Sequence, residues 1–130
     1  MHIKLGCKGR AELTVTPEQT AKAVGSGALA VLATPVMAAL MEQAAWTSIQ
    51  PDLEEGQGSV GIALSLSHDA PTPVGMKVWA ESEVVGVDGK KVSFSVQVYD
   101  EAGRVGSCTH ERVVIDNEKF FTRCQSKLNH

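Results

Sequence analysis

The alternation of apolar and polar residues changes its period along this chain of 130 residues. Residues 8–15 alternate loosely, as in a strand, whereas residues 34–50 hold good helix formers with almost no charged interruption. After residue 58, apolar residues again recur at every second position, which is typical of half-buried strands. We therefore predict one strand, a helical region and then several antiparallel strands.

Two pairs of threonine and proline mark the expected helix starts. The pair at residues 16–17, with glutamine in the capping-box position, predicts a short helix that stops at the Gly-Ser-Gly of residues 25–27. Thr34 and Pro35 predict the N-cap and first turn of a long helix that ends near residue 50, just before a proline. Because apolar residues surround this helix almost completely, we expect it to be buried on most of its surface. Its many alanines would let a sheet, or a second copy of the helix, approach closely.

The second half of the chain predicts a sheet. Four strands are expected, joined in part by turns at residues 88–89 and 100–103, and they span residues 59–67, 76–85, 91–99 and 104–115. The tail from Asp116 predicts one or two helical turns around Phe120 and Phe121. One long helix followed by antiparallel strands indicates an α+β fold, with a curved sheet wrapped around the helix, in a single domain over residues 1–130. The open sheet edges predict a homodimer.

Composition and charge argue against two classes of function, nucleic-acid binding and membrane binding. The net charge of −3 arises from 12 basic and 15 acidic residues that are well mixed, and aromatic residues make up only 5%. Because no basic block and no stacking surface is present, we expect neither a nucleic-acid nor a membrane partner. Three cysteines without metal-ligand spacing, and a start without a secretory h-region, predict free thiols and a cytoplasmic location.

Three polar residues, Thr34, Glu42 and His68, are the candidate catalytic residues. Glu42 is the only charged residue between Lys22 and Asp52, and His68 ends the first strand of the predicted sheet. An acid in apolar surroundings keeps its proton unless a partner such as His68 pairs with it, so the two residues predict a general acid/base pair. Glu42 would activate water or attack a carbonyl directly, and the sequence leaves both routes open. Thr34, at the positive end of the helix, would position or polarise the carbonyl.

Each of these residues also has a structural explanation. Thr34 would serve as a helix cap alone, and Glu42 would be a buried acid bonded to a backbone group or to a partner chain. His68 would be a structural residue before a proline-rich turn. Arg112, in the last predicted strand, would be a solvated surface residue.

The ordered set of Thr34 with Pro35, Glu42 eight residues later, and His68 resembles the hotdog-fold thioesterases, in particular the fluoroacetyl-CoA-thioesterase-like family. Gly61, residues 68–75 and the His-Glu-Arg of residues 110–112 support this resemblance, which covers roughly residues 9–120. It implies a homodimeric hotdog fold and hydrolysis of an acyl-CoA thioester by Thr34, Glu42 and His68. It also implies an acyl-pocket or oxyanion role for Gly61, CoA contact by Arg112, and no metal or cofactor besides the CoA of the substrate.

One segment departs from that family. Members that act on the fluorinated substrate carry bulky aromatics before the catalytic helix, whereas residues 25–32 here hold none. We therefore expect a different small or medium acyl group. The alternatives are a non-catalytic acyl-CoA-binding module and a hotdog-fold hydratase or dehydratase, which the missing histidine in the helix disfavours. The sequence leaves open whether the carrier is CoA or a protein, and whether two dimers associate further.

Overall fold

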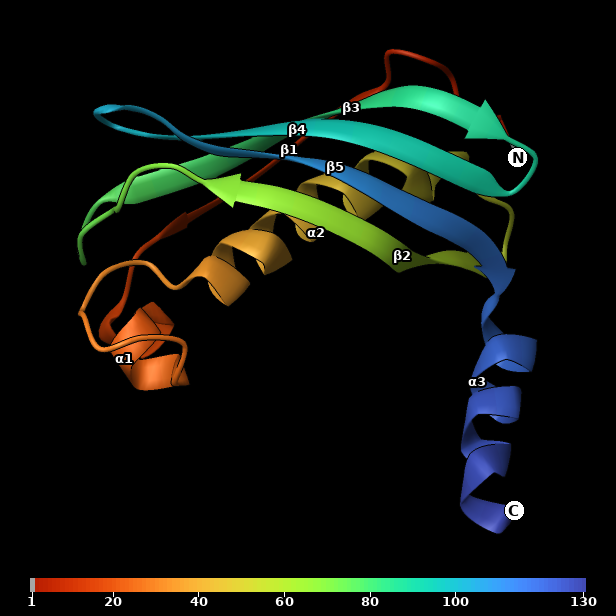
Figure 1. Cartoon of the computed structure of the whole chain (residues 1–130). Coiled ribbons are helices and arrows are strands. Elements are labelled where there is room, and N and C mark those ends of the chain that lie inside the picture. The colour runs from red at the N-terminus through yellow and green to blue at the C-terminus, as the bar shows by residue number, and fades with distance from the viewer. Residues whose placement is uncertain (1) are drawn as a thin grey trace.

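The sheet has five antiparallel strands in the order β1-β3-β4-β5-β2, so the strand that follows the long helix lies at one edge. The computed structural model describes residues 2–130. The strands are β1 (Lys8–Thr14), β2 (Gln57–His68), β3 (Lys77–Asp88), β4 (Lys91–Asp100) and β5 (Gly103–Asp116). All the predicted strands are present, with small differences at their ends. The sheet curls over the long helix α2 (Thr34–Ile49), as Figure 1 shows.

Alternation along the strands produces one buried and one exposed face. In β4 the side chains of Val92, Phe94, Val96 and Val98 are buried, as their spacing predicts. The predicted hairpin between β3 and β4 turns at Gly89, whose φ of +60° favours glycine. The pairing of β2 with β5 shifts register between Gly61 and Ala63, and this bulge lies beside the polar residues described below.

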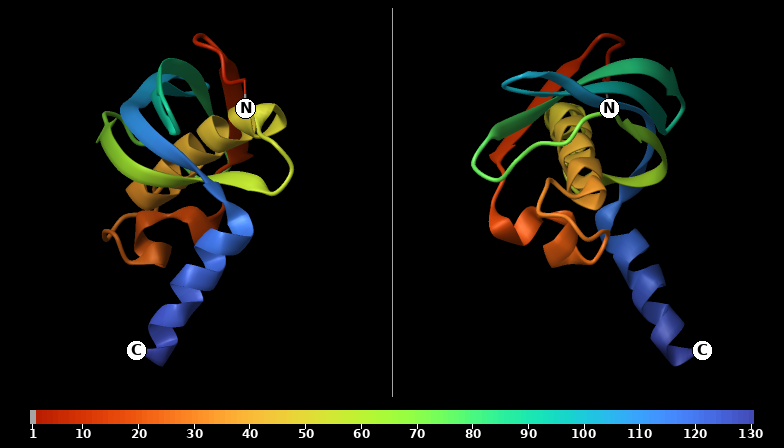
Figure 2. Two further views of the ribbon diagram at one scale, coloured as in Figure 1. Left: turned by 90° about the vertical axis from the view of Figure 1, so that its right-hand side faces the viewer. Right: turned by 60° about the vertical axis from the view of Figure 1, so that its left-hand side comes forward.

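Helix α2 packs one face against the concave side of the sheet. Its buried side chains are Met37, Leu40, Met41, Ala44, Ala45 and Ile49. The opposite face is exposed at Pro35, Ala39, Gln43 and Trp46, and the side chain of Trp46 is 41% exposed. The expectation that most of the helix surface is buried is therefore wrong for a single chain without a partner. The reason is that the sheet covers only one side of the helix, as Figure 2 shows.

The start of α2 differs from the prediction. Ala33 is the N-cap, and Thr34 is the first helical residue rather than the cap. The prediction of a capping role for Thr34 is wrong because its hydroxyl bonds to His68 and not to the backbone of the first turn. The predicted end near residue 50 is confirmed, since a 3-10 turn, η2 (Gln50–Asp52), follows Ile49.

Shorter helices lie on both sides of this core. The predicted short helix consists of a 3-10 turn, η1 (Pro17–Gln19), and one turn of helix, α1 (Ala21–Val24). At the C-terminus, α3 (Asn117–Gln125) and η3 (Ser126–Asn129) form more than the one or two turns expected, and they project away from the sheet (Figure 1). Within residues 2–130, no helix has the length and apolar character needed to cross a membrane.

Candidate active site

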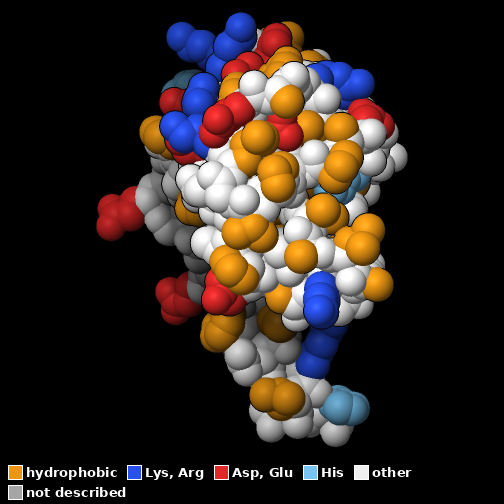
Figure 3. Space-filling model, turned by 90° about the vertical axis from the view of Figure 1, so that its left-hand side faces the viewer, with side chains coloured by type: hydrophobic (Ala, Val, Ile, Leu, Met, Phe, Trp, Pro, Cys, Tyr) orange, Lys and Arg blue, Asp and Glu red, His pale blue; other side chains and the backbone are white. Residues whose placement is uncertain are grey.

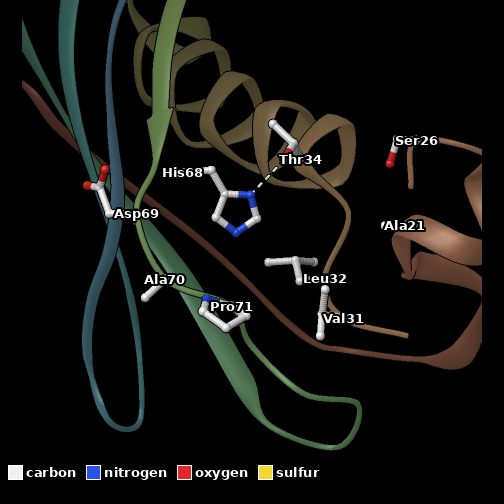
Figure 4. Close-up of a pocket in the computed structure, with 9 residues that line it drawn as sticks. All are labelled: Ala21, Ser26, Val31, Leu32, Thr34, His68, Asp69, Ala70 and Pro71. Atoms are coloured by element: carbon white, nitrogen blue, oxygen red, sulfur yellow. Dashed lines mark hydrogen bonds between the residues drawn. The ribbon is translucent and has the colours of Figure 1, made fainter. Parts of the chain in front are cut away.

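Thr34 and His68 meet where the start of α2 approaches the end of β2. The Thr34 Oγ1 atom lies 2.8 Å from His68 Nδ1, as Figure 4 shows. The pairing depends on where two elements begin and end. Helix α2 begins at Thr34, with Ala33 as its N-cap, and β2 extends to His68, so that the side chains of Thr34 and His68 come into contact. The structure therefore brings together two of the three candidate catalytic residues.

Protonation of His68 follows from its surroundings. Burial lowers the pKa of His68 below its usual 6.5, although the backbone of Ala70 and the charge of Asp69 oppose this shift. The imidazole is therefore neutral at pH 7. Its Nε2 atom is buried and has no hydrogen-bond partner among residues 2–130. The Thr34–His68 hydrogen bond fits both neutral tautomers: the Nδ1–H form donates to Thr34 Oγ1, whereas the Nε2–H form accepts from the Thr34 hydroxyl.

Asp69 does not act as a third member of this pair. Its side chain is turned away from the imidazole (Figure 4), accepts a hydrogen bond from Ser67 Oγ and forms an ion pair of 3.1 Å with Arg104. The site therefore lacks the carboxylate that orients the histidine in a hydrolytic triad within one chain.

A pocket of about 290 Å³ opens beside the pair. Its apolar wall is formed by Ala21, Val31, Leu32, Ala70 and Pro71, and no aromatic side chain lines it. Figure 3 shows apolar side chains spread widely over the side of the molecule on which α1 and the start of α2 lie, with charged groups gathered toward one end. The lining suits a short apolar group held next to Thr34 and His68.

The first turn of α2 offers fewer free N–H groups than a helix start usually does. The N–H groups of Val36 and Met37 both donate to Ala33 O, that of Ala33 donates to Gln19 O, and Pro35 has none. The remaining donor of this turn is the backbone N–H of Thr34. Thr34 thus supplies both a hydroxyl and an N–H at the positive end of the helix dipole.

Glu42 lies in a second polar cluster, two turns further along α2. Its Oε2 atom is 3.2 Å from Arg112 Nη1 and 3.8 Å from His110 Nε2. Within residues 2–130, no hydrogen bond or ion pair joins Glu42 to Thr34 or His68. The predicted pairing of Glu42 with His68 is therefore absent from one chain, and the acid is not isolated in apolar surroundings because β5 brings a cation to it.

Arg112 is buried, with 6% of its surface exposed, so the expectation of a solvated arginine is wrong. Its Nε donates to Ser59 Oγ at 2.8 Å and its Nη2 donates to Ser59 O at 3.0 Å. Burial lowers the pKa of Arg112, and the pairing with Glu42 opposes that shift. The guanidinium is thus held by β2 while it binds the carboxylate of α2.

Gly61 is the point at which β2 leaves room for this ion pair. A Cβ atom at this position would overlap Glu42 Oε2, and it would lie 3.1 Å from His110 Cε1 and 3.4 Å from Arg112 Nη1. Glycine is therefore required here for space rather than for backbone conformation. The suggested acyl-pocket role of Gly61 stays a prediction, as does CoA contact by Arg112.

His110 is a polar residue of this cluster that the sequence identifies only as part of the His-Glu-Arg of residues 110–112, without a role of its own. Alternation along β5 places residues 108, 110, 112 and 114 on the buried face, and this period was the signal that His110 shares a face with Arg112. Among residues 2–130, no group of three His, Cys, Asp or Glu side chains is placed to hold a metal ion.

Comparison with known proteins agrees with this architecture. A family model described as fluoroacetyl-CoA-specific thioesterase matches residues 15–118. The fluoroacetyl-CoA thioesterase of Streptantibioticus cattleyicolor is 41% identical over 97 residues, which are 75% of this chain and 70% of that protein.

Two solved structures show the same fold. A mutant of the fluoroacetyl-CoA-specific thioesterase FlK superposes with a TM-score of 0.91 at 34% identity, covering 98% of each chain. A thioesterase superfamily member from Thermus thermophilus has a TM-score of 0.89 at 30% identity, covering 98% of this chain and 97% of its own. The fold is thus the hotdog fold, as expected from the resemblance. The chain belongs to the fluoroacetyl-CoA-specific thioesterase family.

Proposed function

We propose that this thioester hydrolase cleaves a small or medium acyl-CoA, with Thr34 and His68 at the reacting carbonyl and Glu42 completing the site. The observation that carries this proposal is the hydrogen bond of 2.8 Å between Thr34 Oγ1 and His68 Nδ1 at the rim of an apolar pocket. A neutral imidazole next to a hydroxyl and a free backbone N–H supplies both a base and oxyanion donors.

The chemistry follows from these donors and acceptors. In the Nδ1–H tautomer of His68, the oxygen of Thr34 accepts from Nδ1, so the hydroxyl proton of Thr34 is free to donate to the thioester oxygen, and the backbone N–H of Thr34 is a second donor. Water attacks the acyl carbon as His68 accepts its proton. The C–S bond then breaks, and the CoA thiolate takes the proton that His68 holds. These steps need no metal and no cofactor besides the CoA of the substrate.

The pocket supports a short acyl chain rather than fluoroacetyl. Its volume of about 290 Å³ and its lining by aliphatic side chains suit an apolar group of several carbons. Without an aromatic side chain over the pocket, nothing on its wall distinguishes a C–F bond from a C–H bond.

A homodimer accounts for the distance between Glu42 and the pair. Eight residues along α2 separate Thr34 from Glu42 by about 12 Å of helix rise. The uncovered face of α2 and the free edge of β2, where Ile62 is 52% exposed, offer a surface for a second copy. A two-fold axis at this surface runs the two α2 helices antiparallel, so that Glu42 of one protomer approaches Thr34 of its partner.

We also propose a cytoplasmic location. The three cysteines are unpaired, with Cys7 partly buried, Cys108 buried and Cys124 exposed, which is the usual state in a reducing compartment.

A panel of acyl-CoA thioesters, from acetyl and fluoroacetyl to octanoyl, tests the activity by release of free thiol. We expect a short unsubstituted acyl group to give the highest kcat/KM, and His68→Gln to lower it by about 100-fold or more. Tight binding of an acyl-CoA without hydrolysis by the wild-type protein would instead identify a non-catalytic binding module.

A mixture of two inactive variants tests the shared site. Glu42→Gln and His68→Gln chains are unfolded, mixed and refolded together. If each site takes Glu42 from one chain and His68 from the other, half of the dimers are mixed and each regains one of its two sites, giving about one quarter of the wild-type activity. No recovery, with mixed dimers shown by mass spectrometry, would place Glu42 and His68 of one site on the same chain.

A further inference from the structure

His110 lies at the centre of the second cluster, on the buried face of β5, and no step of the proposed hydrolysis uses it. Its side chain is 1% exposed and stacks against Phe94 of β4, with ring centroids 5.9 Å apart. Both ring nitrogens have polar neighbours: Nδ1 lies 2.8 Å from Ala63 O, and Nε2 lies 3.1 Å from Arg112 Nη1. A buried histidine with two such neighbours is fixed in one orientation.

The neighbours also determine where the proton resides. A backbone carbonyl only accepts, so Nδ1 must carry the hydrogen that bonds to Ala63 O. A guanidinium only donates, so Nε2 must present its lone pair to Arg112 Nη1. His110 is therefore the neutral Nδ1–H tautomer.

The charges around His110 agree with this state. The charged groups that face it are Glu42 from α2, and Arg112 and Glu111 from β5. Burial is the largest effect and lowers the pKa of His110, and Arg112 lowers it further, against the carboxylates and the hydrogen bond to Ala63. Glu42 Oε2 lies 3.8 Å from Nε2, but both atoms are acceptors in this tautomer, and Arg112 Nη1 donates to both of them.

His110 thereby completes the fixation of the guanidinium. Ser59 accepts from Nε and Nη2, which sets one edge of the group, while His110 and Glu42 accept from Nη1 on the opposite side. Without His110, the remaining contact of Nη1 would be with the half-exposed Glu42 side chain, so that the Arg–Glu pair could rotate toward solvent.

We propose that His110 is a positioning residue: as the neutral Nδ1–H tautomer, it orients Arg112 so that the Glu42 carboxylate is held in the geometry needed for thioester hydrolysis. The importance of Glu42 in this statement rests on the proposed function, whereas the tautomer and the orientation of Arg112 do not.

The tautomer is measured directly by NMR on the ¹⁵N-histidine-labelled wild-type protein. We expect the imidazole signal that His110→Gln removes to show, at pH 7, a slowly exchanging proton on Nδ1 and an unprotonated Nε2. His2→Gln, at an exposed position, is the control and should leave the signal in place. A proton on Nε2, or on both nitrogens, would overturn the proposal whatever the activity of the protein.

Kinetics of two replacements test the positioning role. Glutamine can donate to Ala63 O and accept from Arg112, whereas leucine fills the space without polar atoms. We expect His110→Leu to lower kcat by roughly 10- to 100-fold with little change in KM, and His110→Gln to recover most of that loss. The melting temperature of each variant shows whether kcat follows stability instead, a result that would contradict positioning.

Glu42→Gln distinguishes the two proposals. If Glu42→Gln hydrolyses at the wild-type rate, the proposed role of Glu42 fails and the tautomer measurement still stands. If Glu42→Gln is impaired while His110→Leu is as active as the wild type, only the positioning role of His110 is refuted.

Discussion

Replacing Gly61 with alanine tests whether the position of Glu42 limits catalysis. The added methyl group would overlap Glu42 Oε2 and lie 3.1 Å from His110 Cε1, so that this buried ring must also give way by a few tenths of an ångström, whereas 3.4 Å to Arg112 Nη1 is close to an ordinary contact. Because the carboxylate is the flexible end of a side chain that is 42% exposed, it is the group that moves most, by roughly 1 Å. The backbone at Gly61 has no positive φ, so alanine adds no conformational strain.

This displacement has different consequences for stability and for turnover. An ion pair with a half-exposed acid contributes about 0–1 kcal/mol, and crowding of the buried His110 ring costs about 1–3 kcal/mol, so the free energy of unfolding should fall by roughly 1–3 kcal/mol. A misplacement of about 1 Å at a catalytic group costs up to about 100-fold in rate, or about 2.7 kcal/mol of barrier height. Gly61→Ala should therefore be folded but slow.

The assay is thiol release from the best substrate of the acyl-CoA panel, together with urea unfolding of the same preparation. Gly86→Ala is the matched control, because a Cβ atom there meets Ser93 Cβ at an ordinary 3.5 Å. The control should retain activity and stability. Wild-type turnover in Gly61→Ala would show that the contact of Glu42 with Arg112 is not needed for hydrolysis, and the second cluster would then be structural.

Three further measurements test separate parts of the site. Thr34→Val removes the hydroxyl that bonds to His68 and should lower kcat/KM by about 100-fold, whereas Thr34→Ser should retain most of the wild-type kcat/KM. Equal activity of the two variants would show that the hydroxyl takes no part in hydrolysis. The free energy of unfolding should fall as the pH drops from about 8 to about 5.5, because burial lowers the pKa values of His68 and His110 in the folded state and the unfolded chain then binds more protons. Urea titrations at the two pH values check this, and His68→Gln/His110→Gln should weaken the dependence. Burial raises the pKa of Cys108 to about 11, so iodoacetamide should label Cys124 in the folded protein and leave Cys108 unmodified, as mass spectrometry of the peptides would reveal.

The fold could be predicted from the sequence because its signals are local. The alternation in β4 and the Asp-Gly turn before it predict a hairpin from neighbouring residues alone, so no distant residue has to be known. The limits of this reasoning appear at Thr34, where the same Thr-Pro pair that marks a cap elsewhere lies one residue inside the helix. A competing hydrogen-bond partner 34 residues away, His68 Nδ1, decided the outcome, and no local pattern reveals such a partner.

The environment of Glu42 depends on pairings that the sequence does not specify. Arg112 lies 70 residues from Glu42, and it reaches the helix because β5 pairs with β2 in the register that sets Arg112 opposite Gly61. A shift of one residue would turn Arg112 to the outer face of the sheet. The candidate residues were thus visible in the sequence, whereas their partners depended on sheet register.

The anchoring of Glu42 connects catalysis with assembly. A carboxylate bound to a buried guanidinium that Ser59 and His110 also hold cannot swing along α2 to reach the Thr34–His68 pair of its own chain, about 12 Å away by helix rise. In the proposed dimer, an antiparallel neighbour brings a second Glu42 to that pair without moving the first. Activity should then depend on protein concentration near the dissociation constant of the dimer, although the Thr34–His68 hydrogen bond lies wholly within one chain. Constant specific activity on dilution to a monomer observed by light scattering would mean that the pair hydrolyses thioesters alone, and that the Glu42 cluster stabilises the fold of each chain.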